Sequence, residues 1–360
     1  MKSNIDILVE ISRQLGRDKN LVLAGGGNTS FKDGNTLWVK ASGWELANIT
    51  PEGFVPLDRR VISRLQEKRY PEERDKREKE VRRDLIKAKK DPSSPQVPSV
   101  ETYFHEVIDY PWVVHLHPWK INTLTCSREG RRKYPQVLDE NVLWIDFYTP
   151  GLELSRVIEE VIRGLSRVPD TILLQNHGVI IGGEEPDKVM ERIRDIISRI
   201  EHFLPLAIEE DMGEDSPPDE IVDFLNTFWN WNEKNIFFLR CRDIPLELSQ
   251  SFFTPDHIVY YGRYPLWLDG EKELERGFGK YIREREGYPR VIAINGKGVL
   301  GIGDNSRMAK NSAELFLDAV KIYRGTFSFG GPQFLKDEDV EFIDSWEAER
   351  YRRKVMEGKI

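Results

Sequence analysis

A strand, a turn, a second strand and a long helix follow one another twice along this chain, which strongly limits the folds open to it. Residues 172–183 and 291–303 each read as an apolar strand, a turn and a return strand. Amphipathic helix patterns follow over 187–203 and 307–323. Two copies of one unit predict an α/β protein with an internal duplication, which 360 residues can accommodate.

Composition excludes several classes of function. No apolar run approaches the roughly 20 residues of a membrane helix, and the charged N-terminus is unlike a signal peptide. Cys126 and Cys241 are too few for a disulfide framework, which favours the cytoplasm. A net charge of -8 argues against nucleic acid as a partner.

Three of the six histidines are placed to meet at one end of the first unit. His115 and His117 alternate with apolar residues in an extended segment, so their side chains point to the same side. His177 lies in the turn of the first copy, where the second copy has Lys297. A His-x-His pair alone is weak evidence, but three histidines are a common ligand set for catalytic zinc.

Polar turns and one acidic residue accompany the histidines. A hairpin turn at 33–35 follows the segment Gly25-Gly26-Gly27-Asn28-Thr29-Ser30, and Ser42-Gly43 forms a further turn. Ser99 is a good N-cap for a helix running to about residue 109, with Glu101 in its first turn. Further helices are expected over 4–16 and 154–167, and a pair of charged surface helices is expected over 59–90.

These segments, in this order, resemble the class II aldolase/adducin family, and most of all the aldolase half of bifunctional rhamnulose-1-phosphate aldolase/alcohol dehydrogenases. The motifs that carry the resemblance are Gly25-Gly26-Gly27-Asn28-Thr29-Ser30, Leu37-Trp38-Val39-Lys40 with Ser42-Gly43, Pro98-Ser99-Val100-Glu101-Thr102, Thr254-Pro255-Asp256-His257 and, more loosely, the charged tail at 349–353. The resemblance implies a class II aldolase-like three-layer fold over 1–204, an acidic linker over 205–220 and a degenerate second half over 221–360.

The resemblance also implies roles for individual residues. His115, His117 and His177 would bind zinc or another divalent metal such as Mn²⁺ or Co²⁺, with Glu101 as the catalytic acid/base. A substrate phosphate would be held by Gly27, Asn28, Ser42, Gly43 and Ser99. The competing interpretation of Glu101 is an acid favoured by the dipole of the helix N-terminus.

The chain departs from the family pattern in two places. Val100 stands where single-domain phosphoketose aldolases have a second serine, a trait shared with the bifunctional group. No segment forms a Gly-x-Gly-x-x-Gly that opens a helix, so no NAD is expected. His105 occupies a position that the family also has and is expected to be a packed histidine or one that supports the metal ligands from outside, not a fourth ligand. His257 is expected to be structural.

The resulting expectation is a homo-oligomeric lyase that cleaves a ketose 1-phosphate of the rhamnulose or fuculose type to dihydroxyacetone phosphate and lactaldehyde. Alternatives on the same metal site are a pentulose-phosphate epimerase, a dehydratase or a decarboxylase. A third possibility is a non-catalytic interaction protein like adducin, which loss of the metal ligands would favour.

Overall fold

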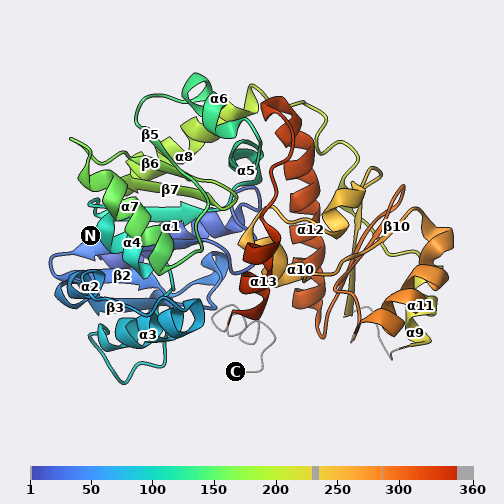
Figure 1. Cartoon of the computed structure of the whole chain (residues 1–360), viewed down its shortest axis with the longest axis horizontal. Helices are drawn as coiled ribbons and strands as arrows, with labels where there is room; N and C mark the ends of the chain where they lie inside the picture. The colour runs from blue at the N-terminus through green and yellow to red at the C-terminus, as the bar shows by residue number, and fades with distance from the viewer. Residues whose placement is uncertain (1, 229–234, 286, 347–360) are drawn as a thin grey trace. The chain divides into compact units, whose positions relative to one another are not determined.

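The computed structural model describes residues 2–228, 235–285 and 287–346, and the chain forms two compact units (Figure 1). The first comprises Met1–Thr125 and Arg131–His202, and the second Cys126–Gly130 and Phe203–Ile360. In the described part of the chain, no helix is long and apolar enough to cross a membrane. The charged tail at 349–353 lies outside the described residues.

A seven-stranded sheet forms the centre of the first unit. Its order is β3 (Phe54–Asp58), β2 (Thr36–Lys40), β1 (Asn28–Asp33), β4 (Trp112–Leu116), β7 (Gly178–Gly183), β6 (Thr171–Leu174) and β5 (Val142–Ile145). The strand pairs are antiparallel except β5 with β6. The expected hairpin is present, with Gly34 in the left-handed region between β1 and β2 at φ 53°.

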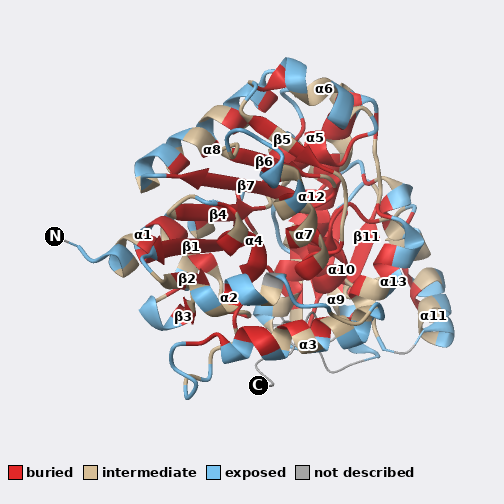
Figure 2. Ribbon diagram, turned by 60° about the vertical axis from the view of Figure 1, so that its left-hand side comes forward, coloured by how far each residue is buried: buried red, intermediate tan, exposed pale blue. Residues whose placement is uncertain are grey.

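Helices cover both faces of this sheet. They are α1 (Asn4–Arg17), α2 (Arg59–Gln66), α3 (Arg74–Lys87), α4 (Thr102–Val107), α5 (Trp119–Thr125), α6 (Gly130–Val137), α7 (Leu152–Arg163) and α8 (Pro186–Glu201). On one face α4 and α7 bury a cluster that includes Phe104, Ile158 and Ile180. On the other face the Ser12 hydroxyl of α1 bonds that of Thr29, so the strands are buried on both sides (Figure 2).

The second unit contains a five-stranded sheet. Its order is β10 (Leu266–Leu268), β11 (Val291–Ile294), β12 (Gly298–Ile302), β9 (Ile236–Arg240) and β8 (Gly213–Glu214). The helices are α9 (Asp219–Asn226), α10 (Pro255–Tyr261), α11 (Leu274–Glu284), α12 (Ser306–Thr326) and α13 (Asp337–Ser345). The segment 205–220, expected to be a linker, therefore contains β8 and the first residues of α9.

The two sheets share one topology over four strands. The order β10-β11-β12-β9 repeats β5-β6-β7-β4, with the first pair parallel and the others antiparallel in both units. A helix joins the parallel pair in each unit, α7 or α11, and a long helix follows the return strand, α8 or α12. The predicted fold class, an α/β unit with helices flanking a sheet followed by a smaller degenerate duplicate, is confirmed.

Two predicted helix boundaries were wrong. The helix expected from Ser99 to about residue 109 spans Thr102–Val107. It follows a turn in which the Ser99 hydroxyl accepts the Glu101 N–H at 3.2 Å, the bond expected of a capping serine. The helix expected over 154–167 spans Leu152–Arg163, with Gly164 as its C-cap.

Candidate metal centre

Three histidine side chains converge at the end of β4. The Nε2 atoms of His115 and His117 lie 2.9 Å apart. One ring nitrogen from each of these residues and one from His177 all lie within 4.8 Å of one another. Among the residues that the structure describes, no other group of His, Cys, Asp and Glu side chains is placed to share a metal ion. His115 is fully buried and His117 is partly exposed, so the cluster runs from the core to the surface.

The turn between β6 and β7 delivers the third histidine. Asn176 adopts a left-handed conformation at φ 52°, and the His177 N–H donates to the Leu174 carbonyl at 3.2 Å. A Cβ at Gly178 would lie 2.2 Å from the Leu116 carbonyl oxygen and 2.9 Å from Cδ2 of His117. Glycine at this position therefore lets the turn approach the strand that carries the other two histidines.

The environment of His115 keeps its ring neutral with Nε2 available. Nδ1 donates to the Val179 carbonyl at 3.0 Å, which leaves the Nε2 lone pair facing the other histidines. Burial is the main cause that holds the pKa of His115 well below its usual range, and the neighbouring His117 and His177 lower this pKa further.

Glu101 presents one carboxylate oxygen to the histidines. Its Oε1 lies 3.4 Å from Nε2 of His177 and 3.6 Å from Nε2 of His115. Its Oε2 accepts a hydrogen bond from the Asn28 side-chain amide at 2.7 Å. The carboxylate is buried, with 8% of the residue exposed, so the Asn28 amide fixes which oxygen faces the cluster.

This donor set fits a divalent metal. Neutral imidazole nitrogens and a carboxylate oxygen are ligands of zinc and of related transition metals. A metal bound here would be held by His115, His117 and His177, with Glu101 beside it. The structure thus brings together the ligands and the acid/base residue expected from the sequence.

A model of the family described as "Class II Aldolase and Adducin N-terminal domain" matches residues 6–200. This match spans more than half of the chain and includes every residue of the cluster. The chain belongs to the class II aldolase and adducin family.

The chain is also similar to three individual proteins. An uncharacterized oxidoreductase of Bacillus subtilis (strain 168), YuxG, is 25% identical over 411 residues that cover 98% of this chain and 58% of the relative. The chain therefore spans little more than half of that protein. The N-terminal class II aldolase domain of a conserved protein from Thermoplasma acidophilum is 29% identical with a TM-score of 0.50, over 56% of this chain and 94% of the other. L-fuculose-1-phosphate aldolase from Thermus thermophilus is 18% identical with a TM-score of 0.37, over 55% and 94% of the two chains.

The residues expected to hold a phosphate surround the segment 97–101 of this family member. The Ser42 N–H donates to the Val97 carbonyl at 2.8 Å, so this amide is already engaged. The side chain of Asn28 is engaged with Glu101, which leaves the hydroxyls of Ser42 and Ser99 and the backbone of the turns for an anion. Gly43 sits next to this segment in the left-handed region at φ 86°.

Gly27 allows its turn to pack closely against β4. Its φ is +63°, and a Cβ there would lie 2.8 Å from the His115 carbonyl oxygen. Asn28 pairs with His115 in the sheet, so this turn leads directly to the histidine cluster. A side chain at position 27 would push β1 away from β4.

The second unit has different side chains at the corresponding positions. In the strand pairing, Phe238 and Arg240 of β9 stand where His115 and His117 stand in β4, and Lys297 takes the place of His177. Lys297 forms an ion pair with Glu271 at 2.9 Å. The described part of the second unit therefore lacks the metal ligands, as the sequence predicted.

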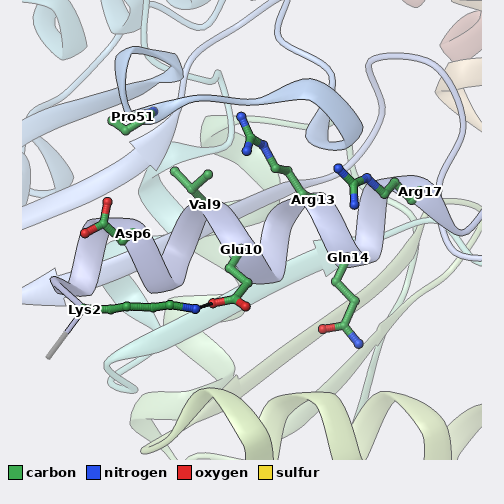
Figure 3. A pocket seen from close by; sticks show the side chains of 8 residues that line it. All are labelled: Lys2, Asp6, Val9, Glu10, Arg13, Gln14, Arg17 and Pro51. Atoms are coloured by element: carbon green, nitrogen blue, oxygen red, sulfur yellow. Dashed lines mark hydrogen bonds and ion pairs between the residues drawn. The ribbon is translucent and has the colours of Figure 1, made fainter.

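A separate depression runs along the outer face of α1 (Figure 3). Its volume is about 860 Å³, and it is lined by Lys2, Asp6, Val9, Glu10, Arg13, Gln14, Arg17 and Pro51. Lys2 pairs with Glu10 at 2.6 Å, and Arg13 donates to the Ile49 carbonyl. The lining contains none of the predicted site residues, and the paired charges are those of a solvated helix face.

The contact of Ser30 with His105 near the centre was not predicted from the sequence. Ser30 is buried, and its hydroxyl bonds Nδ1 of His105 at 2.7 Å. The available signal was its spacing, because Ser30 lies two residues after Asn28 in a strand and therefore on the same side of the sheet.

Proposed function

We propose that this chain is a metal-dependent aldolase that cleaves a ketose 1-phosphate, of the rhamnulose or fuculose type, to dihydroxyacetone phosphate and lactaldehyde. The observation that carries the proposal is the Glu101 carboxylate, whose Oε1 lies within 3.6 Å of ring nitrogens of two of the three clustered histidines. Membership of the class II aldolase and adducin family supports this choice of chemistry.

The residues divide the reaction between them. His115, His117 and His177 would hold a divalent metal, which would supply Lewis-acid stabilisation of the negative charge left on the ketone fragment when the carbon–carbon bond breaks. The electron pair of that bond stays on the ketone fragment, and the hydroxyl of the other fragment gives its proton to the Glu101 carboxylate as it becomes the aldehyde. Glu101 then gives this proton to the hydroxyketone carbon, which yields dihydroxyacetone phosphate.

The surrounding residues prepare the site for this proton transfer. The neutral ring of His115 adds no charge to the site, so it leaves the positive charge of a bound metal uncompensated. Asn28 donates to Oε2 of Glu101, so Oε1 is the oxygen that faces the histidine cluster. The phosphate would bind at the turns around Gly27, Ser42 and Ser99.

The proposal also assigns the chain to a subgroup of the family. We place the chain with the aldolase half of bifunctional rhamnulose-1-phosphate aldolase/alcohol dehydrogenases, acting without NAD and as a homo-oligomer. In support, the Bacillus subtilis relative named as an oxidoreductase matches 98% of this chain but extends well beyond it. The Thr254-Pro255-Asp256-His257 motif belongs to the matched second half.

The test is product analysis with the purified, zinc-loaded protein and both ketose 1-phosphates. Release of dihydroxyacetone phosphate by the wild type, and its loss in Glu101→Gln with the zinc content retained, would support the proposal. Zinc bound stoichiometrically without cleavage of either sugar phosphate would refute it. An epimer, a dehydrated product or carbon dioxide would instead identify a different reaction at the same centre.

A further inference from the structure

A chain of buried hydrogen bonds leads away from Glu101 into the core. The Asn28 amide bonds Oε2 of Glu101 at 2.7 Å, Oδ1 of Asn28 meets Nε2 of His105, and Nδ1 of His105 meets the Ser30 hydroxyl at 2.7 Å. Ser30, Asn28 and His105 are each at most 3% exposed. Both nitrogens of His105 are thus occupied, so this ring cannot serve as a fourth metal ligand in this arrangement.

With Glu101 as the acceptor, one placement of protons satisfies all of these hydrogen bonds. Oε2 of Glu101 accepts from the Asn28 NH₂ group, so the Asn28 group that faces His105 is the carbonyl oxygen. That oxygen needs a donor, which puts the proton of the ring on Nε2 of His105. Nδ1 then carries a lone pair and accepts from the Ser30 O–H.

The positions of these residues follow from the two elements that carry them. Asn28 and Ser30 are alternate residues of β1 and face the same side of the sheet. Glu101 lies one residue before α4, and His105 lies one helical turn later. The hydrogen bonds therefore fasten this six-residue helix to the strand beside the metal centre.

We propose that His105 is a positioning residue, which holds the Asn28 amide so that the Glu101 carboxylate keeps one oxygen directed at the histidine cluster. In this set of hydrogen bonds, which we call the array, the Ser30 hydroxyl fixes the tautomer of His105. The proposal rests on the proposed function for its catalytic consequence, but the tautomer is independent of any reaction.

Loss of the Ser30 hydroxyl should disturb the array in a defined way. Without that donor, the His105 proton can move to Nδ1, where it no longer supports the Asn28 carbonyl. The Asn28 amide can then turn its oxygen toward Glu101, which repels the carboxylate. Removal of outer partners of this kind typically costs about 10–100-fold in activity.

The variants are Ser30→Ala, which removes the hydroxyl, Ser30→Thr, which retains it, and His105→Gln. His202→Gln is the matched control, because His202 is exposed and bonds only the carbonyl of Ser198 among the contacts the structure gives it. The first measurement is ¹⁵N NMR of the metal-free protein, which distinguishes protonated from unprotonated ring nitrogens. The second is the kinetics of sugar phosphate cleavage, and the third is zinc content.

The expected result is an Nε2–H tautomer of His105 in the wild type and Ser30→Thr, and a changed tautomer in Ser30→Ala. Cleavage by Ser30→Ala and His105→Gln should fall about 10–100-fold in kcat with little change in KM and with zinc retained, while His202→Gln matches the wild type. A wild-type Nδ1–H tautomer, or Ser30→Ala with unchanged tautomer and kcat, would overturn the proposal. A wild type that cleaves no sugar phosphate would refute the proposed function, while the NMR result would still decide the array.

Discussion

Replacing Asn28 by aspartate changes one donor group into an oxygen and places a second carboxylate against Glu101. The side-chain nitrogen of Asn28 lies 2.7 Å from Oε2 of Glu101, and both residues are buried. With the two charges centred about 4 Å apart and an effective dielectric constant near 20, their repulsion is about 4 kcal/mol. This energy corresponds to roughly a thousandfold higher affinity for one shared proton.

The consequence is a pH dependence of stability with a definite sign. Between about pH 4 and pH 7 the folded Asn28→Asp protein would hold one proton more than the unfolded chain, in which both carboxyls are already ionised. Because the folded state binds more protons, the free energy of unfolding falls as pH rises. Relative to the wild type, the variant should lose about 4 kcal/mol over this window.

The assay is urea denaturation, followed by circular dichroism, in the presence of a chelator at pH 5 and pH 8. Asn28→Ala is the control, because it removes the same hydrogen bonds without adding a charge and should lose similar stability at both pH values. In the zinc-loaded protein, Asn28→Asp should also cleave substrate slowly at neutral pH, since the shared proton occupies Glu101. Equal pH dependence of stability in wild type and Asn28→Asp would refute the contact between residues 28 and 101.

The repeat supplies a matched pair for a second prediction. Gly178→Ala and Gly298→Ala should each lower the free energy of unfolding by about 1–3 kcal/mol, because each Cβ would meet a strand carbonyl within 2.3 Å. Only Gly178→Ala should also weaken zinc binding, by about 10–100-fold in competition with a chelator, since it displaces His117; equal zinc affinities would contradict this. Burial raises the pKa of Glu78 to about 7, so this side chain costs stability as pH rises from 4.5 through 7. Glu78→Gln should therefore gain up to about 3 kcal/mol on the wild type between pH 4 and pH 8 in urea titrations, and no gain would show that Glu78 ionises freely. Chelation should lower the melting temperature of the wild type but leave His115→Ala unchanged, which differential scanning calorimetry would check.

The histidine cluster could be predicted because its signals are local in the sequence. Alternation along a strand placed His115 and His117 on one side, and the turn of the first repeat copy carried His177. The fold was predictable for a similar reason, because the repeated pattern of strand, turn, strand and helix appears twice. Periodicity of 2 and of 3.6 residues can be read without knowledge of tertiary contacts.

The hydrogen-bond chain behind Glu101 could not be predicted in this way. Ser30 and His105 are 75 residues apart, and Asn28 and Glu101 are 73 apart. No local pattern links them, and each residue type has a common structural use of its own. The start of α4 differs from the prediction for another reason: the Ser99 hydroxyl accepts the Glu101 N–H as a capping serine does, but residues 100–101 form a turn and the helix begins at Thr102.

The two sheets together show that the metal centre needs more than the repeated unit. The strands β4, β6 and β7 carry the histidines and have counterparts in β9, β11 and β12. Glu101 and its support come from β1 and α4, and the second sheet has only the two-residue strand β8 on the corresponding edge. Histidines placed at Phe238, Arg240 and Lys297 could therefore gather a metal ion, yet they would lack a buried carboxylate held beside it. Glu101, the proposed acid/base residue, belongs to the part of the chain that the described repeat does not copy, and this is why the proposed catalysis is expected from the first unit alone.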